Sequence, residues 1–307
     1  MIRGFKGRHI VAIDDFTKDE LIHVLDVARE LEKKKRPHLL DENVVATLFF
    51  EPSTRTRLSF ESAAHRLGAQ VLGFADPEVT SATKGETLHD TIKMVENYAD
   101  VIVMRHPTAG AATEAAAVSA VPVINAGDGP HEHPTQTLVD LYTIKKSQGK
   151  ISGLKIAMVG DLKYGRTVHS LARALSHFDC ELFFVAPASL KMPDDVKKML
   201  DAKDVAYHEV TDLAKVLPRV DILYMTRVQK ERFSSVRDYE KVKNSYILTA
   251  AMLKGVKQNL RVMHPLPRVN EISMDVDETP YALYFEQAGN AVPVREALLA
   301  LVLGKME

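Results

Sequence analysis

The stretch that decides the fold is residues 44–68, VVATLFFEPSTRTRLSFESAAHRLG. Its apolar run, residues 44–50, predicts a buried strand, and the spaced apolar residues that follow Ser53 predict a helix closed by Gly68. The abrupt turn between them places hydroxyl and guanidinium groups in the first turn of the helix, where backbone N–H groups favour an anion. This turn is therefore a candidate phosphate cradle. An ordinary Ser/Thr cap followed by surface arginines is the alternative that the stretch alone leaves open.

Composition limits the class of protein. A chain of 307 residues that is 46% hydrophobic can bury the cores of two ordinary domains. Forty basic and 41 acidic residues give a net charge of -1, so no nucleic-acid partner is expected. The single cysteine, Cys180, excludes an internal disulfide and favours a cytoplasmic location. Residues 1–16 lack the apolar segment of a signal peptide, and no run reaches the ~20 apolar residues of a membrane span, so no membrane partner is expected.

Strands and helices alternate along the chain. Thr17–Glu20 has the pattern of a capping box, which opens a helix, and further helices are expected at 54–67, 87–99, 110–119, 134–149 and 295–303, the last with Pro293 at or just before its start. Strands are expected at 44–50, 71–74, 101–104, 121–126, 154–159, 181–186, 205–209, 221–226, 246–249 and 260–264. This alternation predicts an α/β fold of two doubly wound parallel-sheet domains. The helix at 134–149 joins the domains, and the second begins near residue 150.

Polar clusters follow several of the expected strands. In parallel α/β sheets, ligands bind beyond the carboxyl ends of the strands, so the clusters predict one active site in a cleft between the domains. Such a concentration of positive charge requires anionic ligands, either two anionic reactants or one large polyanion. The cations that define it are Arg55, Lys84, Arg105, Arg166 and Arg227.

Two other motifs admit alternative functions. GDLKYGRT at 160–167 differs from a phosphate-binding GxxxxGK[ST] loop because Arg166 replaces the lysine, which disfavours a nucleotide triphosphatase. His131-Glu132-His133 does not have the HExxH spacing, so no metal is expected. No Ser-His-Asp or Cys-His arrangement predicts a nucleophile. The expected chemistry is positional and electrostatic.

Seven motifs in order carry a resemblance to a known family: STRTRLSFE at 53–61, SATKGETL at 81–88, MRHP at 104–107, HPTQTL at 133–138, GDLKYGRTVHSL at 160–171, YMTRVQKER at 224–232 and HPLPR at 264–268. Over nearly its full length the chain resembles the aspartate carbamoyltransferase catalytic chain. The resemblance implies transfer of the carbamoyl group of carbamoyl phosphate to the α-amine of L-aspartate, the committed step of pyrimidine synthesis, without a cofactor. It also implies a carbamoyl phosphate domain, residues 1–133 with the final helix at about 288–307, and an aspartate domain, residues 134–287.

The resemblance implies a role for each motif. The phosphate is assigned to Ser53, Thr54, Arg55 and Thr56, with Arg105 beside them. Polarisation of the carbamoyl oxygen is assigned to Thr56, Arg105 and His133, and the carbamoyl nitrogen to Gln136 and the carbonyls of Leu266 and Pro267. The two aspartate carboxylates are assigned to Arg166, Arg227 and Gln229, whose guanidinium groups suit bidentate pairing.

The resemblance also implies an assembly. Family members form homotrimers with shared active sites, so Lys84 is expected to contact both substrates from the neighbouring subunit. The serine expected beside Lys84 aligns with either Thr80 or Ser81. Domain closure is assigned to ion pairs among Glu51, Arg166 and Arg232. A separate regulatory chain, nucleotide control and cooperativity are left open.

Some residues depart from the family pattern, and two other functions are considered. Glu132 adds a negative charge close to the predicted site, and residues 109–113, AGAAT, replace a common Glu-Gly-Ala-Ala-Arg. Ornithine carbamoyltransferase, the nearest alternative, would carry a cysteine where this chain has Pro265, and the arginine-bearing loop here suits a dicarboxylate rather than a diamine. A non-catalytic metabolite-binding paralogue has little use for the groups that polarise the carbonyl.

Overall fold

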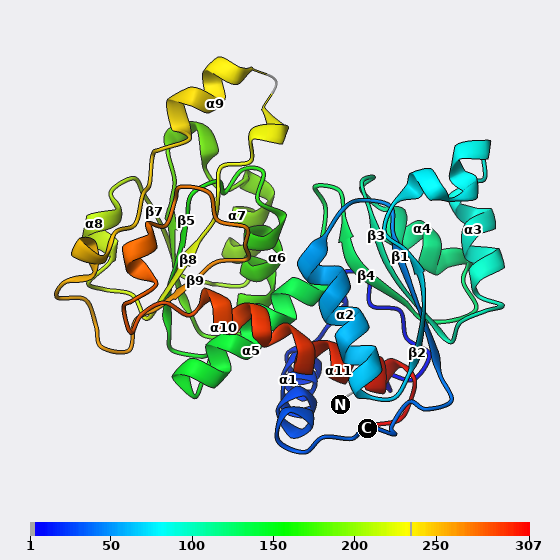
Figure 1. Cartoon of the computed structure of the whole chain (residues 1–307). Coiled ribbons are helices and arrows are strands. Elements are labelled where there is room, and N and C mark those ends of the chain that lie inside the picture. Colours follow the sequence, from blue (N-terminus) through cyan, green and yellow to red (C-terminus); the bar gives the residue numbers. More distant parts are fainter. Residues whose placement is uncertain (1–3, 234) are drawn as a thin grey trace. The chain divides into compact units, whose positions relative to one another are not determined.

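The computed structural model describes residues 4–233 and 235–307, and the chain divides into two compact units. Unit 1 comprises Met1–Tyr142 and Asn290–Glu307, and unit 2 comprises Thr143–Gly289. Each unit has its own parallel β-sheet with helices on its faces (Figure 1). The predicted fold class of two parallel-sheet α/β domains is confirmed. Within the described residues, no helix is both long enough and apolar enough to cross a membrane.

The sheet of unit 1 has the strand order β2-β1-β3-β4. Its strands are β1 (Val44–Phe49), β2 (Gln70–Phe74), β3 (Val101–His106) and β4 (Val123–Asp128). Helices α3 (Leu88–Val95) and α4 (Ala111–Val118) cover one face, and α1 (Lys18–Lys33), α2 (Thr54–Arg66) and α11 (Ala291–Val302) lie on the other (Figure 1). Because β1 and β3 are neighbours in register, the chain segments that follow them leave the same edge of the sheet.

The helical face of unit 1 begins with the predicted capping box. Thr17 Oγ1 accepts a hydrogen bond from the Glu20 N–H at 3.3 Å, and Glu20 Oε2 accepts one from the Thr17 N–H at 2.8 Å. Helix α11 starts at Ala291, so Pro293 lies in its first turn and the prediction of Pro293 at or before the start was wrong. The first-turn N–H groups have no acceptor within the helix, so a proline there removes no hydrogen bond.

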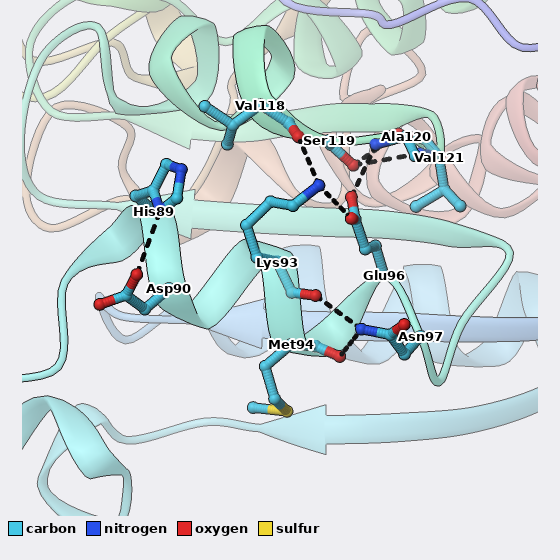
Figure 2. Close-up of polar contacts among 10 residues, drawn as sticks. All are labelled: His89, Asp90, Lys93, Met94, Glu96, Asn97, Val118, Ser119, Ala120 and Val121. Carbon is cyan, nitrogen blue, oxygen red and sulfur yellow. Dashed lines mark hydrogen bonds and ion pairs between the residues drawn. The ribbon is translucent and has the colours of Figure 1, made fainter.

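Helix α3 ends at Val95, four residues before the predicted end. Asn97 Nδ2 donates to the Lys93 carbonyl at 2.7 Å and to the Met94 carbonyl at 3.3 Å, which binds carbonyls left open at the helix end. Figure 2 shows how the same turn is tied to the end of α4 and the chain after it: Lys93 donates to the Val118 carbonyl at 3.3 Å, and Glu96 Oε2 accepts from the Ala120 N–H at 2.7 Å. These contacts fix the helical layer that supports β3.

The sheet of unit 2 has the strand order β7-β6-β5-β8-β9. Its strands are β5 (Lys155–Val159), β6 (Glu181–Val185), β7 (Tyr207–Val210), β8 (Ile222–Met225) and β9 (Arg261–Met263). Figure 1 shows α6 (Arg166–Leu175) and α7 (Asp194–Asp201) on one face and α8 (Leu213–Val216) on the other. The remaining helices are α5 (Pro134–Gln148), α9 (Val236–Val242) and α10 (Tyr284–Gly289).

The strand predicted at 246–249 was wrong. Leu248 makes only an isolated bridge with Ile272, through hydrogen bonds that its backbone exchanges with Glu271 and Ser273 at 2.9 Å each. Leu248 is fully buried, which explains the apolar pattern. A 3-10 turn that begins at Ala250 then ends the extended segment, so no longer pairing forms.

A buried carboxyl group in α11 makes the stability of unit 1 sensitive to pH. Glu296 is 1% exposed, and neither of its side-chain oxygens accepts a hydrogen bond from a described residue. Burial raises the pKa of Glu296, an effect that Lys35 and Arg66 oppose and Glu32 reinforces. Because the folded pKa lies above the unfolded value of about 4.3, folding stability is full below that value and falls as the pH rises through the folded pKa.

We therefore expect Glu296→Gln to increase the free energy of unfolding at pH 8 by on the order of 1 kcal/mol, because the amide carries no charge into the core. The gain should shrink towards pH 4. Urea unfolding at the two pH values measures it, with Glu42→Gln, a change at an exposed glutamate, as the control. An equal gain at both pH values, or none at pH 8, would contradict the account of Glu296.

Candidate active site

The first turn of α2 in unit 1 is the candidate anion cradle. Ser53 is the N-cap, and its side chain makes no capping hydrogen bond with any described residue. Thr54 and Arg55 are exposed, while Thr56 is 6% exposed. The backbone N–H groups of a first helical turn and its hydroxyls are suited to bind an anion, so the cradle stays a prediction for this turn.

Arg105 lies next to this cradle because β3 pairs with β1. The backbone N–H of Phe50 donates to the Arg105 carbonyl at 2.9 Å, which places Arg105 opposite the β1–α2 turn. Its Nη2 is 2.9 Å from Glu51 Oε2, and its Nη1 donates to the Ala126 carbonyl at 3.3 Å. Burial lowers the pKa of Arg105, Glu51 opposes this effect, and Arg55 adds to it. Glu51 thus pairs with Arg105, and its predicted pairs with Arg166 and Arg232 stay a prediction.

His133 and Gln136 lie at the start of α5, which follows the loop after β4. His133 is 5% exposed, and its Nδ1 lies 3.4 Å from Thr135 Oγ1. Gln136 Nε2 donates to Asp140 Oδ1 at 2.8 Å, and Asp140 is fully buried. This bond uses the amide NH2 group of Gln136, so its Oε1 is the atom suited to accept from an N–H group of a ligand.

Asp128 organises the loop before α5, a role that the sequence analysis missed. It is 1% exposed, and its Oδ1 accepts from Asn125 Nδ2 and the Glu132 N–H, both at 3.0 Å. Its Oδ2 accepts from the Gly110 N–H at 2.9 Å and lies 3.1 Å from His131 Nδ1. A buried carboxylate that bonds four groups fixes the backbone from which His133 projects.

In the described part of the chain, no group of three or more His, Cys, Asp or Glu side chains could hold a metal ion.

The loop at 76–86 carries Lys84 on two short 3-10 turns, Pro77–Val79 and Ser81–Lys84. The Thr80 hydroxyl donates to the Pro77 carbonyl at 2.7 Å and accepts from the Ala82 N–H at 3.3 Å. Ser81 and Lys84 are exposed. Because Thr80 holds the loop itself, this geometry favours Ser81 as the hydroxyl that reaches a ligand.

In unit 2, a buried aspartate joins the loops that carry the predicted aspartate ligands. Asp161 is fully buried, and its carboxylate accepts from the backbone N–H of Tyr164 at 3.0 Å and of Gln229 at 3.3 Å. Burial raises the pKa of Asp161, whereas these backbone hydrogen bonds and the charge of Arg227 lower it. Gln229 Nε2 also donates to the Tyr164 carbonyl at 3.0 Å. These bonds hold Gln229 next to the turn that leads into α6.

The turn between β5 and α6 starts at Gly160, where the chain after β8 approaches so closely that only glycine fits. Gly160 has φ +118°, and a Cβ atom there would lie 2.3 Å from the Thr226 carbonyl oxygen. Arg166 is the first residue of α6, and Arg227 follows β8, the strand that pairs with β5. The structure therefore brings Arg166, Arg227 and Gln229 to one edge of the unit 2 sheet. Leu266 and Pro267 follow β9, which neighbours β8 at that edge.

Comparison with known proteins gives first the class and then the family. The family model for the carbamoyl-P binding domain of aspartate/ornithine carbamoyltransferase matches residues 8–146, and the model for the Asp/Orn binding domain matches residues 152–302. Two parallel-sheet domains, one with an anion cradle and one with arginines at its strand ends, thus define a carbamoyltransferase.

Relatives in other organisms identify the family. The aspartate carbamoyltransferase catalytic subunit of Thermococcus onnurineus (strain NA1) is 55% identical over 307 residues, 99% of each chain. The catalytic subunit of M. jannaschii aspartate transcarbamoylase has a TM-score of 0.91 at 49% identity, covering 97% of this chain and 98% of that one. Aspartate transcarbamoylase from Trypanosoma cruzi in complex with carbamoyl phosphate and aspartate has a TM-score of 0.93 at 40% identity, with the same coverage. The chain belongs to the aspartate carbamoyltransferase family, which confirms the resemblance.

Proposed function

We propose that this chain transfers the carbamoyl group of carbamoyl phosphate to the α-amine of L-aspartate, giving N-carbamoyl-L-aspartate and phosphate. The observation that carries the proposal is the match of nearly the whole backbone to the Trypanosoma cruzi enzyme in complex with both substrates. The cradle and the arginines of this chain support it, because the two substrates are a phosphate and a dicarboxylate. This reaction is a step of pyrimidine synthesis.

The phosphate and the carbamoyl oxygen of carbamoyl phosphate are assigned to side chains at the carboxyl edge of the unit 1 sheet. The phosphate accepts from the first turn of α2, with Ser53, Thr54, Arg55 and Thr56, and from Arg105. Thr56, Arg105 and His133 donate to the carbamoyl oxygen. Gln136 Oε1 and the carbonyls of Leu266 and Pro267 accept from the carbamoyl NH2 group. The bond from Gln136 to buried Asp140 supports this role because it fixes which amide atom faces the ligand.

L-Aspartate is assigned to Arg166, Arg227 and Gln229, with Lys84 contacting both substrates. Two forked guanidinium groups match two carboxylates, since each can form a pair of parallel hydrogen bonds. Two hydrogen bonds that Gln229 donates support the assignment: its backbone N–H donates to Asp161, and its side-chain Nε2 donates to the Tyr164 carbonyl, which holds the side chain in one position.

The reaction needs no side-chain nucleophile. The neutral α-amine, with a reference pKa of about 7.7–8.0, attacks the carbamoyl carbon, and the developing oxyanion meets donors already in place. The C–O bond to the phosphate then breaks, and the departing phosphate takes up the amine proton. No cofactor or metal enters this step.

The active assembly is proposed to be a homotrimer in which Lys84 and Ser81 of one subunit complete the site of the next. The exposure of both residues supports this proposal. The departures at 109–113, where α4 begins, and at 130–132 lie on segments that Asp128 links through Gly110 and Glu132, and we assign them to subunit contacts rather than to the reaction. A cytoplasmic location stays a prediction, and a possible regulatory chain that forms a larger assembly stays open.

We expect the purified protein to carbamoylate L-aspartate with a kcat/KM at least about 10³-fold above that for L-ornithine, because a cationic pocket attracts a dicarboxylate and repels a diamine. Measuring phosphate release and the carbamoylated product with each amino acid tests this. Preference for ornithine would assign the chain to the related carbamoyltransferase. Binding of carbamoyl phosphate without turnover of any amino acid would indicate a non-catalytic paralogue.

A further inference from the structure

A buried histidine fixes the loop after β9. His264 is 2% exposed, and its Nδ1 is 2.8 Å from the Leu266 backbone nitrogen. Its Nε2 is 2.7 Å from Glu271 Oε1. Because the Leu266 N–H can only donate, Nδ1 accepts, and the ring proton lies on Nε2 and points to Glu271. Burial lowers the pKa of His264, and the charges of Arg227 and Arg268 lower it as well. Glu271 has the opposite effect, but the pKa stays below its usual value, so the ring keeps this neutral form.

Glu271 anchors the other side of the ring. It is 4% exposed, and its carboxylate also accepts from the backbone N–H groups of Val269, at 3.2 Å, and Asn270, at 3.1 Å. The main-chain N–H of His264 donates to Gln287 Oε1 at 2.8 Å. Each ring nitrogen of His264 therefore makes a hydrogen bond, and the imidazole cannot turn without breaking both bonds.

The residue that His264 holds has an unusual backbone. Leu266 has φ +57°, in the left-handed region, which is unfavourable for a leucine and persists only where the surroundings impose it. The bond from the Leu266 N–H to His264 Nδ1 is such a constraint, and it sets the direction of the peptide carbonyls that follow. These are the carbonyls of Leu266 and Pro267.

We propose that His264 is a positioning residue that makes the site selective for a carbamoyl group over other acyl phosphates. Its Nδ1 holds Leu266 so that two backbone carbonyls face the NH2 group of the substrate. Acetyl phosphate has a methyl group in that place and gains nothing from these acceptors. The inference rests on the proposed function, because it takes the assignment of the carbamoyl nitrogen from it.

Two substitutions separate the two nitrogens of the ring. In His264→Asn the amide oxygen can take the place of Nδ1 and still accept from Leu266, while the bond to Glu271 is lost. In His264→Gln the amide NH2 can take the place of Nε2 and still donate to Glu271, while the acceptor for Leu266 is lost. Both variants are polar and similar in size, so loss of packing alone would affect them alike.

The readout is the dissociation constant of acetyl phosphate divided by that of carbamoyl phosphate, measured without aspartate, with inorganic phosphate as the reference ligand. We expect His264→Gln to lower this ratio about tenfold, since the alignment of two hydrogen bonds is lost, and His264→Asn to lower it less than about threefold. Phosphate binding, which uses the α2 turn, should change by less than about twofold in both.

The outcomes are distinct. If the ratio in His264→Gln equals that of the wild type, or if Asn lowers it as much as Gln, the positioning role of Nδ1 is refuted. If the wild-type protein itself does not distinguish the two acyl phosphates, the inference is refuted, whereas failure to bind carbamoyl phosphate at all would refute the proposed function. Should His264→Gln bind no phosphate because it does not fold, His264→Ala replaces it, because it also removes the acceptor for the Leu266 N–H. That variant should also lower the ratio, and an unchanged ratio would overturn the inference.

Discussion

Arg105→Ala should lower kcat by at least 10²–10³, roughly the cost of removing one donor that stabilises an oxyanion. The guanidinium group is assigned both to the phosphate and to the carbamoyl oxygen, where negative charge grows during the reaction. It lies 2.9 Å from Glu51 and is largely buried, so it is already in position before the substrate binds. Steady-state kinetics with both substrates at saturation measure the loss.

Two further variants separate this role from a loss of charge or of folding. Arg105→Lys keeps one positive charge but cannot donate from two nitrogens at once, so we expect an intermediate rate. Arg173→Ala removes an arginine whose partner is the exposed Asp195, at 3.4 Å, and should leave kcat nearly unchanged. Near-normal turnover in a folded Arg105→Ala protein would refute the carbonyl role.

Most of the fold follows from the sequence because the spacing of apolar residues is regular and glycine and proline mark the ends of the elements. The run at 44–50 is apolar except for Thr47, as expected for a strand covered on both faces, and Gly68 closes the helix after it. The errors at Pro293 and at the strand predicted for 246–249 have one cause. Pro293 and Leu248 were interpreted from local rules, whereas burial of α11 and the pairing of Leu248 with Ile272 depend on segments distant in sequence.

The site could be predicted only in part. Charged residues such as Arg105 and Arg166 stand at strand ends, where their chemistry is visible in the sequence itself. Asp128 and Asp161 are different, because each is a single acidic residue beside a glycine, and its role exists only through backbone N–H groups from another loop. The His264–Glu271 bond is likewise invisible until the chain folds back. Motifs can thus indicate candidate ligand-binding residues, whereas the residues that hold those candidates in place are identified only from the folded structure.

Mixing two inactive variants should restore activity if the site is shared between subunits. Arg55→Ala removes a group from the α2 cradle, and Lys84→Ala removes the exposed lysine of the 76–86 loop. In a trimer built from both, one interface joins an intact Arg55 to an intact Lys84. Random reassociation makes three-quarters of the trimers mixed, so about a quarter of wild-type activity is expected from two preparations that have almost none.

The two variants, one of which carries a charged tag, are dissociated, mixed and reassociated. The tag allows trimers of different composition to be separated, which verifies mixing. The kcat of the hybrid trimers is then compared with that of the unmixed trimers. A third protein, the double variant Arg55→Ala/Lys84→Ala mixed with wild type, provides the reference, because every mixed trimer with two wild-type chains retains one intact shared site. If verified hybrids of the single variants stay inactive while this reference is active, Lys84 acts within its own subunit or not at all. Recovery near a quarter instead requires that each chain lends its lysine to a neighbour, which makes assembly a condition of catalysis.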